Sequence, residues 1–145
     1  MRHLILNANE AHPVGWTDLF MVSHADLTDA VALEQQTVVL KTLGIGTVVS
    51  NVLLLEVKVV PAGLTTCVCS VGPAGINMLS AVDVVGTRYH VPAHNKGAYV
   101  IADAASQLVA IFKPNTGAES LSLLTAGEFW IWASCNRAAD RRVEV

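Results

Sequence analysis

The stretch LTAGEFWIWASC, residues 124–135, decides which kind of fold the chain adopts. If it is a β-strand, successive side chains point to opposite faces of a sheet. Trp130, Trp132 and Ser134 then share one face, where a half-exposed strand would carry polar groups. The other face is apolar and holds Phe129, Ile131, Ala133 and Cys135. Both faces of this strand therefore need to pack against other protein groups, and the sequence does not directly show which groups pack on the tryptophans.

Short runs rich in β-branched residues precede this strand, and glycine and proline separate them. Residues 48–60 alternate most clearly, with Glu56 and Lys58 on the polar face. Residues 76–85 fit either a strand or a short helix. No long segment has a helical period, so the sequence predicts an all-β fold, a β-sandwich or jelly roll of about seven to nine short strands. The candidate strands are residues 18–27, 34–43, 48–60, 64–71, 76–85, 97–102, 106–114 and 128–135.

The two ends of the chain differ from this middle. Residues 1–16 contain asparagine, proline and glycine, which disfavour a long regular element, so we expect an extended N-terminal arm with Trp16 anchoring its far end. Residues 137–145 are charged and are expected to form a short C-terminal tail. A single β-sandwich domain, residues 17–136, lies between them.

The composition indicates a surface that other protein covers. The chain has 145 residues, of which 52% are hydrophobic and only 14% charged, against about 25% charged in an ordinary soluble domain. Between Leu43 and Val82 the only charged residues are Glu56 and Lys58. A domain of this size must still hydrate its surface, so sparse charge favours burial of some surface in an assembly. The net charge of −3 does not favour a nucleic-acid partner.

The sequence also gives no sign of a membrane or secretory segment. The longest charge-free stretch, residues 59–82, is broken by prolines and glycines, whereas a spanning helix needs about 20 continuous apolar residues. The first residues hold an apolar run too short for the centre of a signal peptide. We therefore expect no membrane partner and a protein made and kept in a cytoplasm.

The cysteines and histidines do not form a recognised metal or redox motif. Cys67 and Cys69 are too close in sequence for an unstrained disulfide, so the three cysteines are expected to be reduced thiols. His90 and His94 flank Pro92, which disfavours the helix that would bring both imidazoles to one metal.

Catalytic motifs are equally scarce. No GxxxxGK phosphate loop and no GxSxG elbow occurs, and nothing in the sequence brings Ser70, His24 and Asp26 together as a triad. Trp130 and Trp132 could stack on a sugar ring, although packing is the simpler interpretation of two tryptophans. The sequence therefore predicts a protein that is not an enzyme and that needs no cofactor or metal.

Several segments occur in a recognisable order. They are HADLTDA, QTVVLKTL, VLLLEVKVV, TTCVCSVG, MLSAVDVV and LVAIFKPNTGAESLSLLTAG, followed by the aromatic strand. This order resembles a family of small β-sandwich virion proteins of tailed bacteriophages, over residues 23–136. The most specific piece is Gly117-Ala118 followed by LTAG at residues 124–127. These motifs mark turns and strand ends, so the resemblance concerns the fold more than the role.

The resemblance implies a component of a phage particle, with capsid decoration as the expected role. Such decoration (cement) proteins sit on the outside of the shell, often as homotrimers, and bridge neighbouring subunits of the major capsid protein. The expected location is the capsid exterior of the virion, after synthesis in the bacterial cytoplasm. A neck, tail or receptor-binding accessory protein of the virion is the alternative. This chain departs from the family pattern in its arm, in an enlarged loop at residues 86–97 and in its basic tail.

These expectations suggest a cover for the tryptophans. A neighbouring subunit would cover the face that carries Trp130 and Trp132, and the alternative is that the N-terminal segment of the same chain covers it. The residues expected at an oligomer or capsid interface are Trp16, Phe129, Trp130, Trp132, Arg137, Arg141 and Arg142.

Overall fold

A computed structural model describes residues 1–6, 15–92 and 97–137 of the chain, and its fold is all-β. The described residues contain no α-helix and two single-turn 3₁₀ helices, η1 (His24–Asp26) and η2 (Leu121–Leu123). The strands are β1 (Arg2–Ile5), β2 (Asp18–Ser23), β3 (Gln36–Leu43), β4 (Thr47–Val49), β5 (Leu54–Ala62), β6 (Cys67–Pro73), β7 (Leu79–Asp83), β8 (Tyr89–His90), β9 (Tyr99–Val100), β10 (Ser106–Pro114), β11 (Ala126–Ala133) and β12 (Cys135–Arg137).

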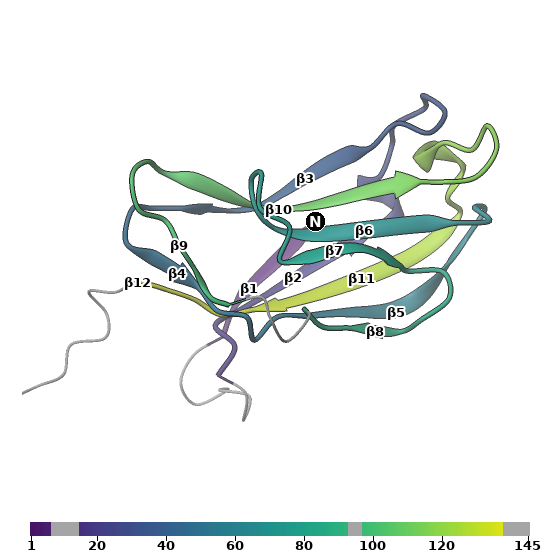
Figure 1. Ribbon diagram of the computed structural model, residues 1–145. Coiled ribbons are helices and arrows are strands. Elements are labelled where there is room, and N and C mark those ends of the chain that lie inside the picture. The colour runs from purple at the N-terminus through teal and green to yellow at the C-terminus, as the bar shows by residue number, and fades with distance from the viewer. Residues whose placement is uncertain (7–14, 93–96, 138–145) are drawn as a thin grey trace, which may run out of the picture.

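The strands form two large sheets that lie in two layers, and a small third sheet at one end (Figure 1). The first layer has the strand order β1-β2-β11-β5-β8, and the second has the order β3-β10-β6-β7. The small sheet has the order β12-β4-β9. All of these strand pairs are antiparallel.

The core lies between the two layers. On β11, Phe129, Ile131 and Ala133 are fully buried, as the alternation of the sequence predicts. Phe129 meets Phe112 of β10 across the layers, with ring centroids 4.9 Å apart. Other fully buried side chains of the core come from both layers: Phe20, Val22, Leu43, Leu55, Cys67, Cys69, Val71, Leu108 and Ala110.

The residue alternation of β5 holds only along part of the strand. Leu55 and Val57 are buried, whereas Val59, which strict alternation would place on the same face, is exposed. The pairing of β11 with β5 shifts register on both sides of Glu128. Such a bulge changes the direction in which the following side chains point, which explains the exposed Val59.

The N-terminal segment contributes a strand that the sequence did not predict. Residues 2–5, expected in an arm, form β1 and pair with β2 at the edge of the five-stranded sheet. The backbone N–H of Leu6 continues this pairing by donating to the carbonyl of Thr17 (2.8 Å). At the other end, β12 carries the regular structure one residue beyond the expected limit at 136. Short strands of this kind depend on their partner strand, so the local sequence signals them poorly.

Two further expectations are settled by the strands. Residues 76–85, left open between strand and helix, contain β7. The enlarged loop expected at residues 86–97 carries β8, which pairs with β5, while residues 93–96 lie outside the described part of the chain.

Candidate functional site: the tryptophan face and the Asp18 network

The tryptophan face is the outer surface of the five-stranded sheet around Trp130 and Trp132. Both side chains are half-buried and point away from the core. In the register of the sheet Trp130 pairs with Met21 and Trp132 with Leu19, and both of these β2 residues are buried. The face is therefore already largely covered within the chain.

Trp16 supplies part of that cover. Its ring packs on Trp132 with centroids 5.1 Å apart, and Trp132 lies 6.0 Å from Trp130. The indole N–H of Trp16 donates to the carbonyl of Val52 (3.1 Å), which fixes the ring. The expected anchoring role of Trp16 thus takes the form of a row of three indoles. This arrangement corresponds to the alternative in which the N-terminal side of the same chain covers the tryptophans.

Charged side chains complete the face. The indole N–H of Trp130 donates to Glu128 (2.8 Å), and that of Trp132 donates to Glu56 (3.3 Å). Lys58 lies over the Trp130 ring, with its Nζ 4.5 Å from the centroid, and pairs with Glu56 (3.2 Å). A buried indole needs a partner for its N–H, and a cation over the ring adds attraction. These contacts hold the rings in fixed positions.

The remaining predicted interface residues divide into two groups. Phe129 is fully buried in the core against Phe112, so it offers no surface to a partner. It points to the opposite side of β11 from the tryptophans, as alternation requires. Arg141 and Arg142 lie outside the described residues, and of Arg137 only its backbone, in β12, is described.

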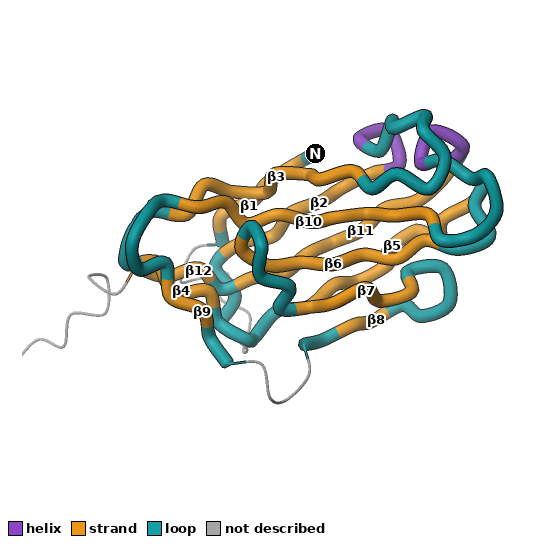
Figure 2. The backbone as a smooth tube through the Cα atoms, turned by 45° about the horizontal axis from the view of Figure 1, so that its top comes forward, coloured by secondary structure: helices purple, strands orange, loops and turns teal. Residues whose placement is uncertain are grey.

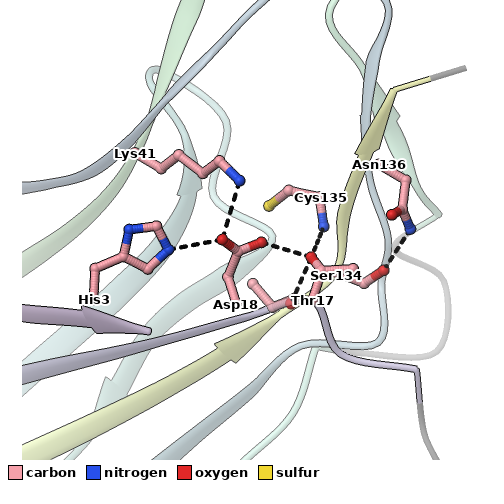
Figure 3. A network of polar contacts seen from close by, with 8 residues as sticks. His3, Thr17, Asp18, Lys41, Ser134, Cys135 and Asn136 are labelled. Atoms are coloured by element: carbon pink, nitrogen blue, oxygen red, sulfur yellow. Dashed lines mark hydrogen bonds and ion pairs between the residues drawn. The ribbon is translucent and has the colours of Figure 1, made fainter. Parts of the chain in front are cut away.

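A second cluster, the Asp18 network, links three strands of the two layers (Figure 3). The Asp18 side chain is 1% exposed. Its Oδ1 accepts a hydrogen bond from Lys41 Nζ (3.0 Å) and lies 2.7 Å from His3 Nε2, while Oδ2 accepts from the Thr17 hydroxyl (2.5 Å). His3 comes from β1, Asp18 from β2 and Lys41 from β3. The carboxylate therefore ties the N-terminal strand to both layers.

The network continues toward β12. The Thr17 hydroxyl accepts from the backbone N–H of Cys135 (2.9 Å), and Asn136 donates to the hydroxyl of Ser134 (3.0 Å). Burial, together with the nearby negative charge of Asp18, raises the pKa of the Cys135 thiol to about 12. A thiol with such a pKa stays protonated at neutral pH and is a poor nucleophile. This arrangement can position strands, and it holds no activated nucleophile.

Sequence reasoning missed the Asp18 network. Its members are far apart along the chain, and a single aspartate at the start of a strand carries no motif. The one available signal was that Asp18 falls, by alternation, on the same side of its strand as Phe20 and Val22, where a carboxylate must find partners.

The other residues considered for chemistry do not assemble into a site. Ser70 lies in β6 and accepts from the backbone of Ala81, while His24 and Asp26 lie in η1. The Asp26 carboxylate bonds to Ser23 and to the amino group of Met1 instead. His94 is outside the described residues, which contain no group of three or more His, Cys, Asp or Glu able to hold a metal.

The three cysteines are free thiols, as expected. Burial raises the pKa of Cys67 to about 12, and that of Cys69 lies well above its usual range for the same reason. Both side chains act as small apolar groups in the core.

Comparisons with family models, curated proteins and solved structures found no match for this chain. In the described part of the chain, no helix has the length and apolar character needed to cross a bilayer.

Proposed function

We propose that the chain is a structural protein of a tailed-bacteriophage virion, and that it acts as a capsid decoration (cement) protein. In this role the domain, which we assign to the β-sandwich class of the jelly-roll kind, binds the outer surface of the major capsid shell. Its attachment stabilises the shell. The protein would work by adhesion alone, without catalysis.

The observation that carries this proposal is the apolar surface of the domain. Only 14% of the residues are charged, yet fifteen large apolar side chains remain exposed among the described residues. Exposed apolar residues are ordinary when they are scattered over a well-charged surface. Sparse charge together with such exposure favours a protein that covers part of its surface with other protein.

The family resemblance supplies the kind of assembly. Its most specific pieces fall at turns and strand starts in this fold, since Gly117 lies in the turn after β10 and residues 124–127 lead into β11. These positions shape the domain. The assignment to a phage shell therefore depends on the resemblance, and the need for a protein partner depends on the surface.

A homotrimer is part of the proposal. Linking three copies raises the effective concentration of each binding site and slows release from the shell. Trp130 and Trp132 keep part of their surface exposed. In the trimer, a neighbouring subunit would cover this exposed part.

A neck, tail or receptor-binding accessory protein of the virion is the second candidate. The observation that favours it is the accessible aromatic ring of Tyr89, which is 62% exposed. Rings of this kind can stack on a sugar.

The test uses expanded shells that lack this protein, prepared from the phage that encodes it. Adding the purified chain should raise the melting temperature of the shells, while an equal concentration of an unrelated small protein should not. Shells that bind no added chain and melt at the same temperature would contradict the decoration role.

A further inference from the structure

The loop between η1 and β3 exposes four consecutive apolar residues. Residues 30–33 read Ala-Val-Ala-Leu, and all four are exposed; Val31 is 60% and Leu33 42% exposed. The 3₁₀ helix η2 lies beside this loop, because the N–H of Ser122 donates to the carbonyl of Asp29 (2.9 Å). Leu123 of η2 is also exposed, at 49%. Exposed runs of this length are unfavourable in a loop unless they serve a function.

The side chain of Gln36 holds the base of this apolar loop, residues 30–33. Its Oε1 accepts from the backbone N–H groups of Thr28 (2.9 Å) and Asp29 (3.1 Å), and its Nε2 donates to the carbonyl of Asp26 (2.7 Å). The carboxylate of Asp29 in turn accepts from the N–H of Val31 (2.8 Å). The start of the loop is therefore fixed by two side chains, that of Asp29 before the loop and that of Gln36 after it.

The loop is also fixed to the loop after β10, and the two lie together at one end of the molecule (Figure 2). The N–H of Leu33 donates to the carbonyl of Glu119 (2.9 Å). The carboxylate of Glu119 accepts from the N–H (2.9 and 3.0 Å) and the hydroxyl (2.6 Å) of Thr65, in the turn between β5 and β6. A surface held in place before binding loses less conformational entropy when a partner docks.

The backbone of Leu33 is strained. Its φ is +60°, in the left-handed region that a bulky side chain seldom adopts and that glycine or asparagine adopts more readily. Non-glycine residues in this region cluster at binding and active sites, where the surrounding structure holds them. The chain thus presents a leucine at an exposed position where the backbone disfavours one.

The loops around residues 30–33 carry a net negative charge. The loops that form this end, residues 24–35, 62–66 and 115–125, contain no lysine or arginine. Their acidic residues are Asp26, Asp29, Glu34 and Glu119. The carboxylate of Asp26 pairs with the amino group of Met1, so the net negative charge comes from Asp29, Glu34 and Glu119.

From these observations we propose that residues 30–33 are a docking site for a second protein, whose surface offers an apolar pocket bordered by lysine or arginine side chains. The fixed apolar side chains would fill the pocket, and the acidic groups would face the basic border. The identity of this partner rests on the proposed function, under which it is the major capsid protein of the shell. A pocket on this chain itself, beside Tyr99 and Ile101, carries the acidic Asp103 and so does not complement the loop.

The experiment compares loop variants with a matched control in binding to expanded shells lacking this protein. Val31→Thr and Leu33→Asn remove apolar contact and keep similar size, and the asparagine tolerates the positive φ. Ile45→Thr is the control, because Ile45 is also 60% exposed but lies in the turn between β3 and β4. We expect the double variant Val31→Thr/Leu33→Asn to bind about tenfold or more weakly, and the control to bind like wild type.

Thermal unfolding separates docking from folding. Leu33→Asn relieves backbone strain, so its melting temperature should equal or exceed that of the wild type while its binding is weaker. If the wild type binds shells and the double variant binds equally well, the docking site is overturned and the proposed function stands. If the double variant instead only lowers the solution mass of the chain, the occupant is a second copy and the proposal is overturned. If the wild type does not bind shells at all, the proposed function fails, and the partner assigned here fails with it.

Discussion

At the scale of single residues, Asp18 is a buried carboxylate that depends on its hydrogen-bond partners. A carboxylate removed from water needs partners, and here His3, Lys41 and Thr17 provide them from three places in the sequence. The same carboxylate joins the N-terminal strand to both layers. Asp18 therefore contributes to the architecture of the protein, and its neighbours leave neither carboxylate oxygen free for chemistry.

Asp18→Asn should lower the free energy of unfolding by about 2 kcal/mol, because the buried carboxylate loses its charge-assisted hydrogen bonds, while Lys41, which is 32% exposed, can return to water. Urea unfolding at neutral pH measures the change. Asp103→Asn, at an exposed position, is the control and should change the free energy by less than about 0.5 kcal/mol. Equal effects of the two substitutions would show that the network does not stabilise the fold.

Glu119 gives a pH-dependent effect at the same scale. The hydrogen bonds from the Thr65 side chain and backbone hold the pKa of Glu119 below its usual 4.5. A carboxylate whose pKa is lower in the folded state stabilises the fold above its unfolded pKa, and this stability is lost as the pH falls through the folded value. The melting temperature of wild type should therefore exceed that of Glu119→Gln most at neutral pH, with the gap closing below pH 4.5. A gap that is constant with pH would contradict this role.

At the scale of elements, the turn between β5 and β6 depends on close approach of two backbones. Gly63 has φ +99°, and a Cβ added there would collide with the carbonyl of Leu123 in η2. Gly46 also has a positive φ (+85°), but nothing lies within 4 Å of the position its Cβ would take. Both glycines therefore have a positive φ, but only at Gly63 would an added side chain also collide with a neighbouring backbone.

Gly63→Ala should therefore destabilise the protein more than Gly46→Ala, by at least about 1 kcal/mol. The φ strain is common to both substitutions, so the difference isolates the collision with η2. Chemical denaturation of the two variants measures it. Equal destabilisation would mean that η2 moves aside at no cost.

Which strands were predictable follows from their length and alternation. β2, β3, β7 and β10 lie within the expected runs, and β5, β6 and β11 overlap theirs and extend two residues beyond one end, because each carries enough alternating or β-branched residues to be recognised. β1, β4, β8 and β12 have two to four residues each, so they depend on hydrogen bonds from a partner strand distant in sequence. β9 is equally short, but it lies within the expected run at residues 97–102. This is why more strands are present than the seven to nine expected, and why part of the expected arm belongs to a sheet.

At the scale of the whole molecule, the contacts that build the candidate sites could not be predicted from the sequence either, because they join distant segments. Alternation alone placed Trp130 and Trp132 on the outer face of β11. It did not show that Glu56, Lys58 and Trp16 converge on them from other segments, nor that His3 and Lys41 converge on Asp18. Contacts between distant segments depend on strand order and register, which a single sequence does not carry.

The expected homotrimer is tested by the solution mass of the chain. Light scattering should give about three times the 15.4 kDa of one chain, and Trp130→Ala with Trp132→Ala should lower it if a neighbour completes the tryptophan face. A monomeric wild type would contradict a self-contained trimer. A trimer unaffected by both substitutions would show that the indoles serve the packing of a single chain, with Trp16 as their cover.

The copy number of the chain in purified virions tests the central claim most directly. Quantitative mass spectrometry, with peptides of the major capsid protein as the internal reference, gives the ratio of the two proteins. A decoration protein should be present at a ratio close to one, which means hundreds of copies in a particle. A dozen copies or fewer would place the chain in the neck or tail and contradict the shell role, and its absence from the particle would contradict a virion role altogether.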